Sequence, residues 1–454
     1  MYQNPDGTLK PGISSQDIQE IVRYVNPSDI QIADEYNVEV FAEQLDSPIS
    51  MLFTEEGYMI IAESGLTSDN PKVLLLVDDH FEVIADRFNV PITGINYYNG
   101  VIYVSHRGNV SVINLDGSKV NIIAGLPSNG DYLNNRVVFG SDNKIYFGQG
   151  TATNSGVVGI DNDWVPIAPF TCDYPGDYIT LYGQNFDTNN MLVENTLGEI
   201  ADTGAFSHYG VPNLPYELRK GVVKASGSIL RANLDGTQLE LVAWGFRNPS
   251  YMRFDKSDRL FVSNNGYEVR GSRPIANALD EFYIVLPELW YGWPDFSGGL
   301  PITLPEFKPE GGVQPEFLLM KHPNIPPRPF TTFPANSGIR GFDFNYTTFG
   351  PEGDVYIAEF GGRRTRVEGV LSSSAGVGHR ISKIDMQTGV ISTFASNKSS
   401  YPASATGEGG FERPADVAFG PDGAMYVLDM GLDASDIPND FVPKTGVIWK
   451  ITKT

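Results

Sequence analysis

One pattern of apolar and polar positions recurs six times along the chain. Each copy has an apolar stretch with strand-like alternation, a tight turn with Gly, Asn or Asp, and a second apolar stretch that ends in a polar residue. The copy at 416–431, DVAFGPDGAMYVLDMG, shows it most clearly. Repeats of short strands and tight turns are typical of propellers whose blades are four-stranded sheets. The pattern therefore predicts an all-β fold, a six-bladed β-propeller.

Alignment of the six copies at their turns gives two equivalent positions. Three residues after the turn the side chain is apolar or aromatic, and we expect it in the core: Ile60, Tyr103, Tyr146, Phe261, Tyr356 and Tyr426. Six residues after the turn it is polar: Glu63, His106, Gln149, Asn264, Glu359 and Asp429. A single residue of this kind can cap backbone groups at a strand end. As a set present in every blade, these residues predict a polar funnel around the propeller axis.

The first residues are expected to lie on the outside of the ring. Residues 1–35 are predicted to form an N-terminal extension with a short helix, because apolar residues recur at helical spacing over 18–25. The alternating segment 37–42 is expected to pair with a strand of the last blade, because closure of the ring by both termini leaves no open sheet edge.

The propeller itself is predicted to span 36–454, with two long interruptions. The third blade is interrupted at about 155–226 and the fourth at 267–338, where the repeat is absent. Long insertions in repeat proteins usually decorate the binding face.

Composition narrows the class of partner. The 454 residues carry a formal net charge of −23, which opposes binding to nucleic acid or anionic lipid and suits cations and neutral polyols. The single Cys172 has no partner for an internal disulfide and is expected to be a buried thiol. No run of 18 apolar residues occurs, and residues 1–10 lack the pattern of an export signal, so we expect no membrane span and leave the compartment and oligomeric state open.

Arginines gather in the loops at one end of the blades. In a four-stranded blade, the loop leading into the first strand and the loop joining the second strand to the third lie at the same end. Guanidinium forks bind carboxylates bidentately and lie flat on planar rings. Five arginines in these loops predict a site for a flat polyanionic cofactor or an acidic sugar, the alternative being ion pairs with the many carboxylates: Arg247, Arg340, Arg363, Arg364 and Arg413.

An aromatic stretch in the fourth-blade insertion, WYGWPDFSGG, suits a sugar. Aromatic faces stack on the C–H surface of a sugar while carboxylates and amides accept its hydroxyl groups. Burial of the two tryptophans under the insertion is the alternative. The candidate substrate contacts are Trp290, Tyr291, Trp293 and Asp295, together with Asn134 before the third blade.

Carboxylates supply the candidate metal ligands. Glu268, Asp280 and Glu281 would provide hard oxygen ligands for calcium, although their spacing matches no compact calcium loop. Glu63 and Asp429 would hold a divalent cation near the axis. The sequence has no GxSxG, HExxH or phosphate-loop motif, so it gives no support to hydrolase or nucleotide-binding functions that depend on them.

Four stretches resemble the glucose/sorbosone dehydrogenase family: WGFRNPSYMRFD, NGYEVRGSRPIANALDEFY, WYGWPDFSGG and RPADVAFGPDGAMYVLDMG. The resemblance implies a six-bladed propeller that holds pyrroloquinoline quinone (PQQ) with calcium, oxidises sugar hydroxyl groups and is exported. Arg247 and Asn248 match the family's Gly-x-Arg-Asn pair near the quinone, and Arg413 and Arg363 match further cofactor contacts. Gln149, at the end of a repeat strand, is a fifth candidate for the cofactor.

The resemblance places the family's catalytic histidine where this chain has Tyr132 in the stretch LPSNGDYLNN. A phenol with an ordinary pKa near ~10 is a poor proton acceptor at neutral pH. The residues left to handle a proton are therefore Tyr132, Asp131 and His106.

Three functions remain open at this point. The first is a PQQ-dependent dehydrogenase acting on a small sugar or polyol in an axial funnel. The second is a lactonase or lyase propeller that depends on a divalent metal held at the axis. The third is a non-catalytic carbohydrate-binding propeller that has lost the family's histidine.

Overall fold

A computed structural model of the chain describes residues 21–114, 117–194, 198–362, 366–367, 370–371, 376–433 and 441–454. The short helix expected in 18–25 lies partly outside these residues, and the described part, 21–26, contains no helix. A 3-10 turn, η1 (Pro27–Asp29), follows it. In the described part of the chain, the one α-helix is α2 (Ala403–Thr406), and no helix is long and apolar enough to cross a membrane.

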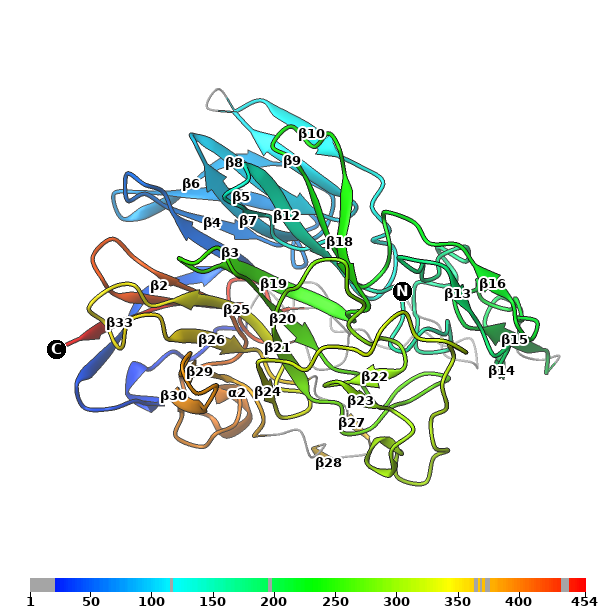
Figure 1. The fold of residues 1–454 in the computed structure, drawn as a ribbon. Helices are drawn as coiled ribbons and strands as arrows, with labels where there is room; N and C mark the ends of the chain where they lie inside the picture. Colours follow the sequence, from blue (N-terminus) through cyan, green and yellow to red (C-terminus); the bar gives the residue numbers. More distant parts are fainter. Residues whose placement is uncertain are drawn as a thin grey trace.

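Six antiparallel sheets form the body of the molecule (Figure 1), which confirms the predicted all-β, six-bladed propeller. The strands of blades one to three, in chain order, are β3 (Pro48–Phe53), β4 (Met59–Glu63), β5 (Lys72–Val77), β6 (His80–Asp86); β7 (Ile92–Tyr98), β8 (Val101–His106), β9 (Asn109–Ile113), β10 (Lys119–Ile123); and β11 (Val138–Phe139), β12 (Lys144–Gln149), β17 (Ser228–Asn233), β18 (Glu240–Trp244). Those of blades four to six are β19 (Asn248–Phe254), β20 (Leu260–Asn265), β21 (Asp280–Ile284), β24 (Thr331–Phe333); β25 (Ile339–Phe344), β26 (Val355–Glu359), β29 (Arg380–Ile384), β30 (Ile391–Asn397); and β31 (Pro414–Phe419), β32 (Met425–Asp429), β33 (Gly446–Lys453), β2 (Tyr36–Leu45).

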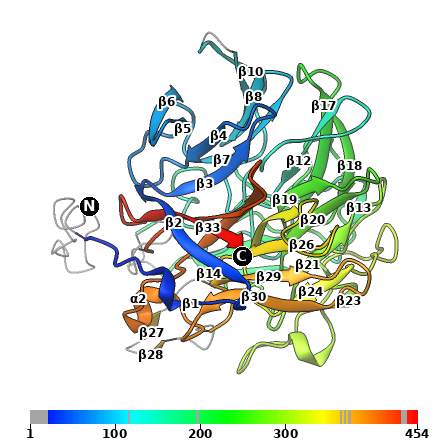
Figure 2. The ribbon, with the colours of Figure 1, turned by 90° about the vertical axis from the view of Figure 1, so that its left-hand side faces the viewer.

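The amino-terminal strand β2 closes the ring. It pairs antiparallel with β33 of the last blade, with Tyr36 opposite Lys453 and Val40 opposite Trp449, and the two strands lie side by side in Figure 2. This pairing confirms the expectation for 37–42. A shorter strand, β1 (Ile30–Gln31), adds to the outer edge of blade five beside β30. Both blades therefore depend on the first described residues for their outermost strands.

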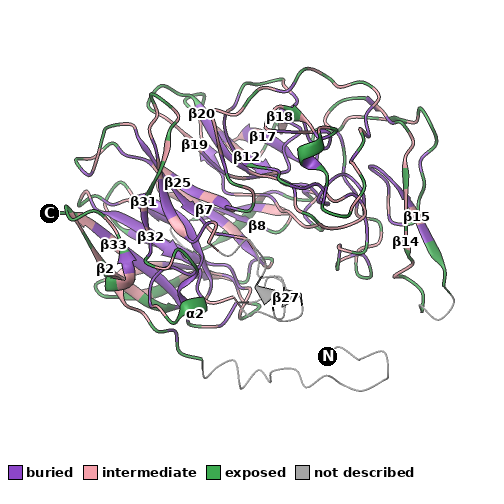
Figure 3. Ribbon diagram, turned by 90° about the horizontal axis from the view of Figure 1, so that it is seen from below, coloured by how far each residue is buried: buried purple, intermediate pink, exposed green. Residues whose placement is uncertain are grey.

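The core lies between adjacent blades, where the strands are mostly buried (Figure 3). The side chain three residues after each turn is buried in five blades and half-buried at Tyr146 in the third. Between blades six and one, for example, Met51, Ile61, Leu428 and Ile448 pack together in one cluster. Burial of each such side chain contributes about 1.5 to 3 kcal/mol, so the blade-to-blade contacts are a major part of the stability.

The two insertions lie on one side of the ring and pack on each other. The third-blade insertion contains two ribbons, β13 (Ile179–Thr180) with β16 (Leu218–Arg219) and β14 (Asn185–Asn189) with β15 (Ile200–Gly204), which stand out at the right of Figure 1. The range expected as the fourth-blade insertion, 267–338, includes two strands of the blade itself, β21 and β24. Its other described elements are β22 (Phe296–Ser297), β23 (Leu300–Pro301) and η3 (Pro305–Phe307). A small pair, β27 (Arg366–Val367) and β28 (Val370–Leu371), belongs to blade five's loop.

A buried ionic cluster lies on the propeller axis. Arg136, which leads into blade three, contacts Asp416 of blade six at 3.4 Å, and Tyr251 of blade four donates to the same carboxylate at 2.5 Å. Blades three and six are opposite in a ring of six, so this contact spans the axis. Gly94 and Gly341 leave room for it, because a Cβ atom on Gly341 would lie 2.4 Å from Asp416 Oδ1.

Candidate functional site

The six polar strand-end residues do not line an open funnel. They are buried, and most of them bind backbone groups of the loop that leads into their own blade. Glu63 Oε1 accepts from Asp46 N at 2.9 Å, and Asp429 accepts from Glu412 N and Arg413 N at 2.8 and 2.9 Å. Asn264 Oδ1 accepts two backbone N–H groups in the same way, and Glu359 instead binds Arg380 at 3.0 Å. The expectation of a polar funnel is therefore wrong, because side chains at strand ends satisfy N–H groups that the sheet leaves unpaired.

His106 has the same structural task. Its Nδ1 accepts from Asn89 N at 3.1 Å and its Nε2 lies 2.7 Å from Ser111 Oγ. Burial and the nearby Lys119 lower the pKa of His106 to about 4, so the imidazole is neutral at physiological pH. Both ring nitrogens are already engaged, which leaves His106 poorly placed to take a substrate proton.

The expected sugar wall is buried packing. Trp290, Tyr291 and Trp293 are 0%, 3% and 3% exposed, and Trp290 donates its indole N–H to the Trp293 carbonyl oxygen at 2.9 Å. Asp295 is fully buried against Arg273 at 3.0 Å. Asn134, also buried, donates to Asn109 O at 2.9 Å. The aromatic residues and Asp295 belong to the packing of the insertions, whereas Asn134 links the loop before blade three to blade two. All five are buried and present almost no surface to a sugar.

The candidate metal ligands are spread over separate local networks. Asp280 accepts backbone N–H bonds from Gly266, Gly338 and Ile339, while Glu281 accepts from Asn264 Nδ2 at 2.7 Å. Burial raises the pKa of Asp280 to about 6 and that of Glu281 to about 7. Glu63 pairs with Lys72 and Asp429 with Arg23. Within the described ranges, no group of three or more His, Cys, Asp or Glu residues is arranged to hold a metal ion.

Of the five loop arginines, Arg247, Arg340 and Arg413 can be placed in the structure, whereas Arg363 and Arg364 lie outside the described residues. Arg340 lies over the Phe360 ring, 3.8 Å from its centroid, and donates to Met430 Sδ at 3.7 Å. Arg413 is buried and donates to the carbonyl oxygens of 360, 361 and 362, with an ion pair to Asp433 at 2.7 Å. Gln149 is also buried and donates to Pro127 O at 3.2 Å. Their hydrogen-bonding groups hold the protein's own loops together.

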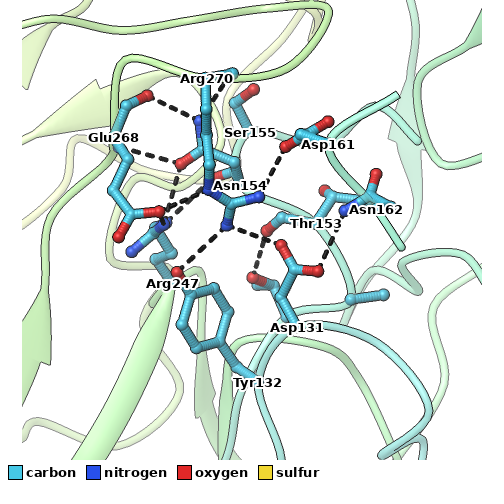
Figure 4. Close-up of polar contacts among 12 residues, drawn as sticks. Asp131, Tyr132, Thr153, Asn154, Ser155, Asp161, Asn162, Arg247, Glu268 and Arg270 are labelled. Carbon is cyan, nitrogen blue, oxygen red and sulfur yellow. Dashed lines mark hydrogen bonds and ion pairs between the residues drawn. The ribbon is translucent and has the colours of Figure 1, made fainter. Parts of the chain in front are cut away.

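Arg247 is similarly committed (Figure 4). Its guanidinium donates to both oxygens of Asn154 at 3.1 and 2.9 Å and to Gly266 O at 2.6 Å, and it pairs with Glu268 at 3.2 Å. The Arg247 guanidinium lies over the Tyr132 ring, with 4.5 Å between the ring centroid and Cζ. The neighbouring Asn248 donates to Asn265 Oδ1 at 2.8 Å. A phenol of the protein thus occupies the stacking position that a flat ligand would need on Arg247.

A half-exposed ionic cluster lies beside Arg247 and centres on Arg270 (Figure 4). Arg270 pairs with Asp131 and Asp161, each at 2.6 Å, and with Glu268, and it donates to the Tyr132 hydroxyl at 3.3 Å. These side chains come from the loop before β11, the third-blade insertion and the loop after β20. We call these five residues the Arg270 cluster. Its charged side chains are less buried than those of the strand-end residues, with exposures of 12% for Asp131, 13% for Asp161, 26% for Arg270 and 37% for Glu268.

Aromatic and amide groups hold the cluster in place. Asp131 Oδ1 accepts from the indole of Trp164 at 2.8 Å and from Asn162 Nδ2 at 3.0 Å. Trp164 is itself half-buried against Val165 and other apolar residues of the insertion. The cluster therefore has a fixed carboxylate with an aromatic ring beside it.

Electrostatics make the cluster slightly negative and leave Tyr132 protonated. With Arg247 included, two guanidinium groups face three carboxylates, a sum of −1 when all are ionised. Burial raises the pKa of the Tyr132 phenol above its ordinary value, and it also raises the pKa of Asp161. Burial lowers the pKa of Arg270, but Tyr132, Asp131 and Glu268 more than offset this and raise it overall. A protonated phenol among carboxylates suits neutral hydroxyl groups better than anions.

Sequence reasoning found Asp131, Tyr132 and Glu268 but missed the residue that joins them. Arg270 stands in the stretch NGYEVRGSRPIANALDEFY, yet nothing in its spacing marks it as a centre. Asp161 and Trp164 lie in DNDW of the third-blade insertion, where the repeat gives no frame of reference. The available signal was the acidic DNDW stretch of one insertion and the Glu268–Arg270 pair of the other.

The described residues do not fit PQQ in the way that the resemblance implies. The donors of Arg247 and Arg413 are taken by protein oxygens, and the Tyr132 ring contacts the Arg247 guanidinium. A ligand with several carboxylates would also meet a cluster of net negative charge.

No family model matches the chain, and no curated protein matches it. Among solved structures, three sugar dehydrogenases resemble it over almost their whole length. They are the PQQ-bound aldose sugar dehydrogenase of Streptomyces coelicolor (15% identity, 93% of this chain and 99% of that chain covered, TM-score 0.52), the holo PQQ domain of pyranose dehydrogenase from Coprinopsis cinerea (14%, 95% and 98%, 0.56), and the apo soluble aldose sugar dehydrogenase of Escherichia coli (14%, 92% and 100%, 0.53). The chain thus shares its fold with these three structures.

Proposed function

We propose that this propeller binds a neutral sugar or polyol at the Arg270 cluster. In this proposal no quinone stacks on Arg247, because Tyr132 already occupies that position. The observation that carries the proposal is the half-exposed set of Arg270, Asp131, Glu268 and Tyr132, held rigid by partners from three loops. The Glu268 carboxylate, whose side chain is 37% exposed against 12% for Asp131, can accept from sugar hydroxyl groups, and guanidinium and phenol groups can donate to sugar oxygens. The likeness to sugar dehydrogenases supports a carbohydrate as the ligand class.

The chain's own residues favour binding over proton abstraction. Tyr132 keeps its proton because burial raises its pKa, and His106 has both ring nitrogens engaged elsewhere. Asp131 accepts from Arg270, Trp164 and Asn162, so its lone pairs are largely used. A base with a free lone pair and a pKa near neutral is what proton removal from a sugar requires.

A PQQ-dependent sugar or polyol dehydrogenase, with calcium, is the second candidate. It is favoured by the full-length likeness to a PQQ-bound structure and by Arg247 and Asn248 at the start of β19. It requires the Tyr132 ring to move away from Arg247. The guanidinium would also have to break its contacts with Asn154 and Glu268 in order to bind the cofactor. In that case Tyr132→His should both open the face and supply a base, and raise dye-linked turnover by ~100-fold.

Calorimetry with small ligands separates the two. Purified protein is titrated with a panel of aldoses and polyols, and separately with PQQ in the presence of Ca²⁺. We expect saturable heat with a sugar and none with PQQ. Arg270→Lys keeps the charge but loses the planar fork, so sugar affinity should fall about tenfold or more. The same substitution at the exposed Arg87 is the control.

Stoichiometric PQQ binding with aldose-dependent dye reduction would overturn the first candidate in favour of the second. Lactone hydrolysis that depends on a tightly held divalent ion would overturn both.

A further inference from the structure

The ribbon of β13 and β16 has one buried and one exposed face. Ile179 and Leu181 are 2% and 1% exposed and pack in a cluster that includes Trp244, Trp290 and Trp293. Because alternate residues of an extended strand point to opposite faces, the neighbours of Ile179 and Leu181 point outward. The ribbon therefore presents a defined outer face on a firmly packed base.

The outer face carries large aromatic and apolar side chains in solvent. Tyr178 and Tyr182 are 58% and 47% exposed, and Leu218 on the paired strand is 60% exposed. Tyr216, in the turn just before β16 with φ 65°, is 70% exposed. Leu218 pairs directly with Thr180, which lies between the two tyrosines of the other strand. We call Tyr178, Tyr182, Tyr216 and Leu218 the tyrosine platform.

Backbone hydrogen bonds fix the platform at both edges. Tyr216 N donates to Leu181 O at 3.0 Å on one side of the segment 178–182. On its other side, Tyr182 N donates to Leu318 O and Met320 N donates to Thr180 O, each at 2.9 Å. The third-blade and fourth-blade insertions thus hold the rings on a shared backbone, so a ligand need not order a loop in order to bind.

Charge identifies the class of partner. The four platform residues and the neighbouring Thr180 and Lys220 include no acidic residue, whereas the exposed Asp177 and the ion-paired Glu217 flank them and the chain as a whole carries −23. A second copy of so acidic a chain would be repelled at close approach, and so would a polyanion. A neutral ligand meets no such barrier.

We propose that the tyrosine platform binds a neutral polysaccharide chain. Tyrosine rings stack on the C–H faces of sugars, and their hydroxyl groups exchange hydrogen bonds with sugar oxygens and water. Residues four apart in an extended strand are about 13 Å apart, so Tyr178 and Tyr182 span several linked sugars. The platform is thereby suited to a polymer, and it is separate from the Arg270 cluster, whose ligand is a small sugar.

Affinity electrophoresis tests the platform. Native gels contain hydroxyethyl cellulose, galactomannan, mannan or pullulan as neutral probes, with alginate as the polyanionic probe. We expect at least one neutral polymer to retard the protein and alginate not to. Each of Tyr178→Ala, Tyr182→Ala and Tyr216→Ala should weaken the interaction about tenfold, and the triple variant should abolish it. Tyr58→Ala is the matched control, because Tyr58 is also 58% exposed but lies in the turn between β3 and β4.

Melting temperatures close to that of the wild type in all variants would show that the fold is intact. Retardation that survives in the triple variant, or that Tyr58→Ala reduces equally, would overturn the proposal. So would the absence of retardation by every neutral polymer, or a wild-type dimer that the triple variant converts to a monomer. Because small sugars at the Arg270 cluster are measured by calorimetry, either proposal can fail without the other.

Discussion

At the scale of single residues, the clearest physical property is a group of buried carboxyls with little opposing charge. Burial raises the pKa of Glu281 to about 7 and that of Asp173 to about 6. Such a group binds its proton more tightly in the folded than in the unfolded protein. Its contribution to stability is therefore fully present below the unfolded pKa and is lost as pH rises through the folded pKa.

Glu281→Gln should flatten this pH dependence. In the wild type, the Glu281 contribution to the unfolding free energy should fall by about 2 to 3 kcal/mol between pH 4.5 and 7, since one pKa unit corresponds to about 1.4 kcal/mol. The amide cannot ionise, so the variant should lose that share of the slope. Urea unfolding from pH 4.5 to 8 measures it, with Glu306→Gln, an exposed residue of η3, as control. Parallel pH profiles for the wild type and Glu281→Gln would contradict the raised pKa.

The sequence located the polar and charged residues correctly, but it did not predict which groups of the protein they bind. The polar positions of the repeat are real, but a strand end supplies unpaired N–H groups that compete for the same side chains, and Asn264 and Asp429 bind those groups. Likewise Arg247 stands where the resemblance places it, yet its partners come from Asn154 and Glu268 in two insertions. The sequence contains no signal for contacts of this kind, because they depend on how the insertions fold.

At the scale of elements, the segment before β2 is fastened to the last blade by one buried arginine. Arg23 is 8% exposed, donates to Thr445 O and Gly410 O at 2.9 and 2.7 Å, and pairs with Asp429 at 2.8 Å. Burial opposes the ionised form of Asp429, but Arg23 outweighs it, so the pKa of this carboxyl is lowered. Helical spacing predicted a short helix over 18–25. The described residues 21–26 form no helix, and the Arg23 side chain holds this segment in place.

Arg23→Met should destabilise the fold by about 3 kcal/mol, because it leaves the Asp429 carboxylate buried without its ion pair. Arg87→Met, at an exposed ion pair, should change stability by less than about 1 kcal/mol. Chemical denaturation at pH 7 compares the two. The loss should also shrink on acidification, because a lowered carboxyl pKa stabilises the native state above the unfolded pKa and this share disappears as pH falls. Equal, small effects of both substitutions would show that Arg23 does not hold the segment.

The repeat predicted the strands well and the insertions poorly. Aligned turns located the first two strands of every blade, because alternation and turn residues are local properties of the chain. The ribbons β13–β16 and β14–β15 follow no repeat, and β21 and β24 lie inside the range expected as an insertion. Pairing between segments distant in sequence fixes these elements, and local pattern carries little information on it.

At the scale of the whole molecule, opposite blades meet on the axis through Arg136, Tyr251 and Asp416. These buried groups contact one another where the inner strands of blades three, four and six meet. The glycines of the facing strands are part of the arrangement, since Gly94 lies against Arg136 and Gly341 against Asp416. The axis is therefore a structural centre, and the half-exposed chemistry lies to one side, between the two insertions.

Gly341→Ala should perturb this centre. Its added methyl group would lie 2.4 Å from Asp416 Oδ1 and 2.6 Å from Asp416 Cα, so β31 must shift, at a cost of about 1 to 3 kcal/mol. Gly312→Ala is a control outside the axis, where the nearest atom is Pro309 Cβ at 3.1 Å. Thermal unfolding of both variants measures the difference. If Gly341→Ala melts with the wild type, the axial cluster has room to relax and is not a rigid centre.

Closure of the ring makes β2 (Tyr36–Leu45) important for the stability of the whole propeller. Deletion of 1–45 removes β1 and β2 and exposes the edge of β33. It also exposes the apolar residues of blade six against which Val38 and Val40 pack. An open edge of this length invites pairing with other chains, so the truncated protein should aggregate or melt well below the wild type. Deletion of 1–12 spares both strands and should leave the melting temperature unchanged. Light scattering with thermal unfolding compares the two truncations, and equal melting temperatures would mean that the ring holds without β2.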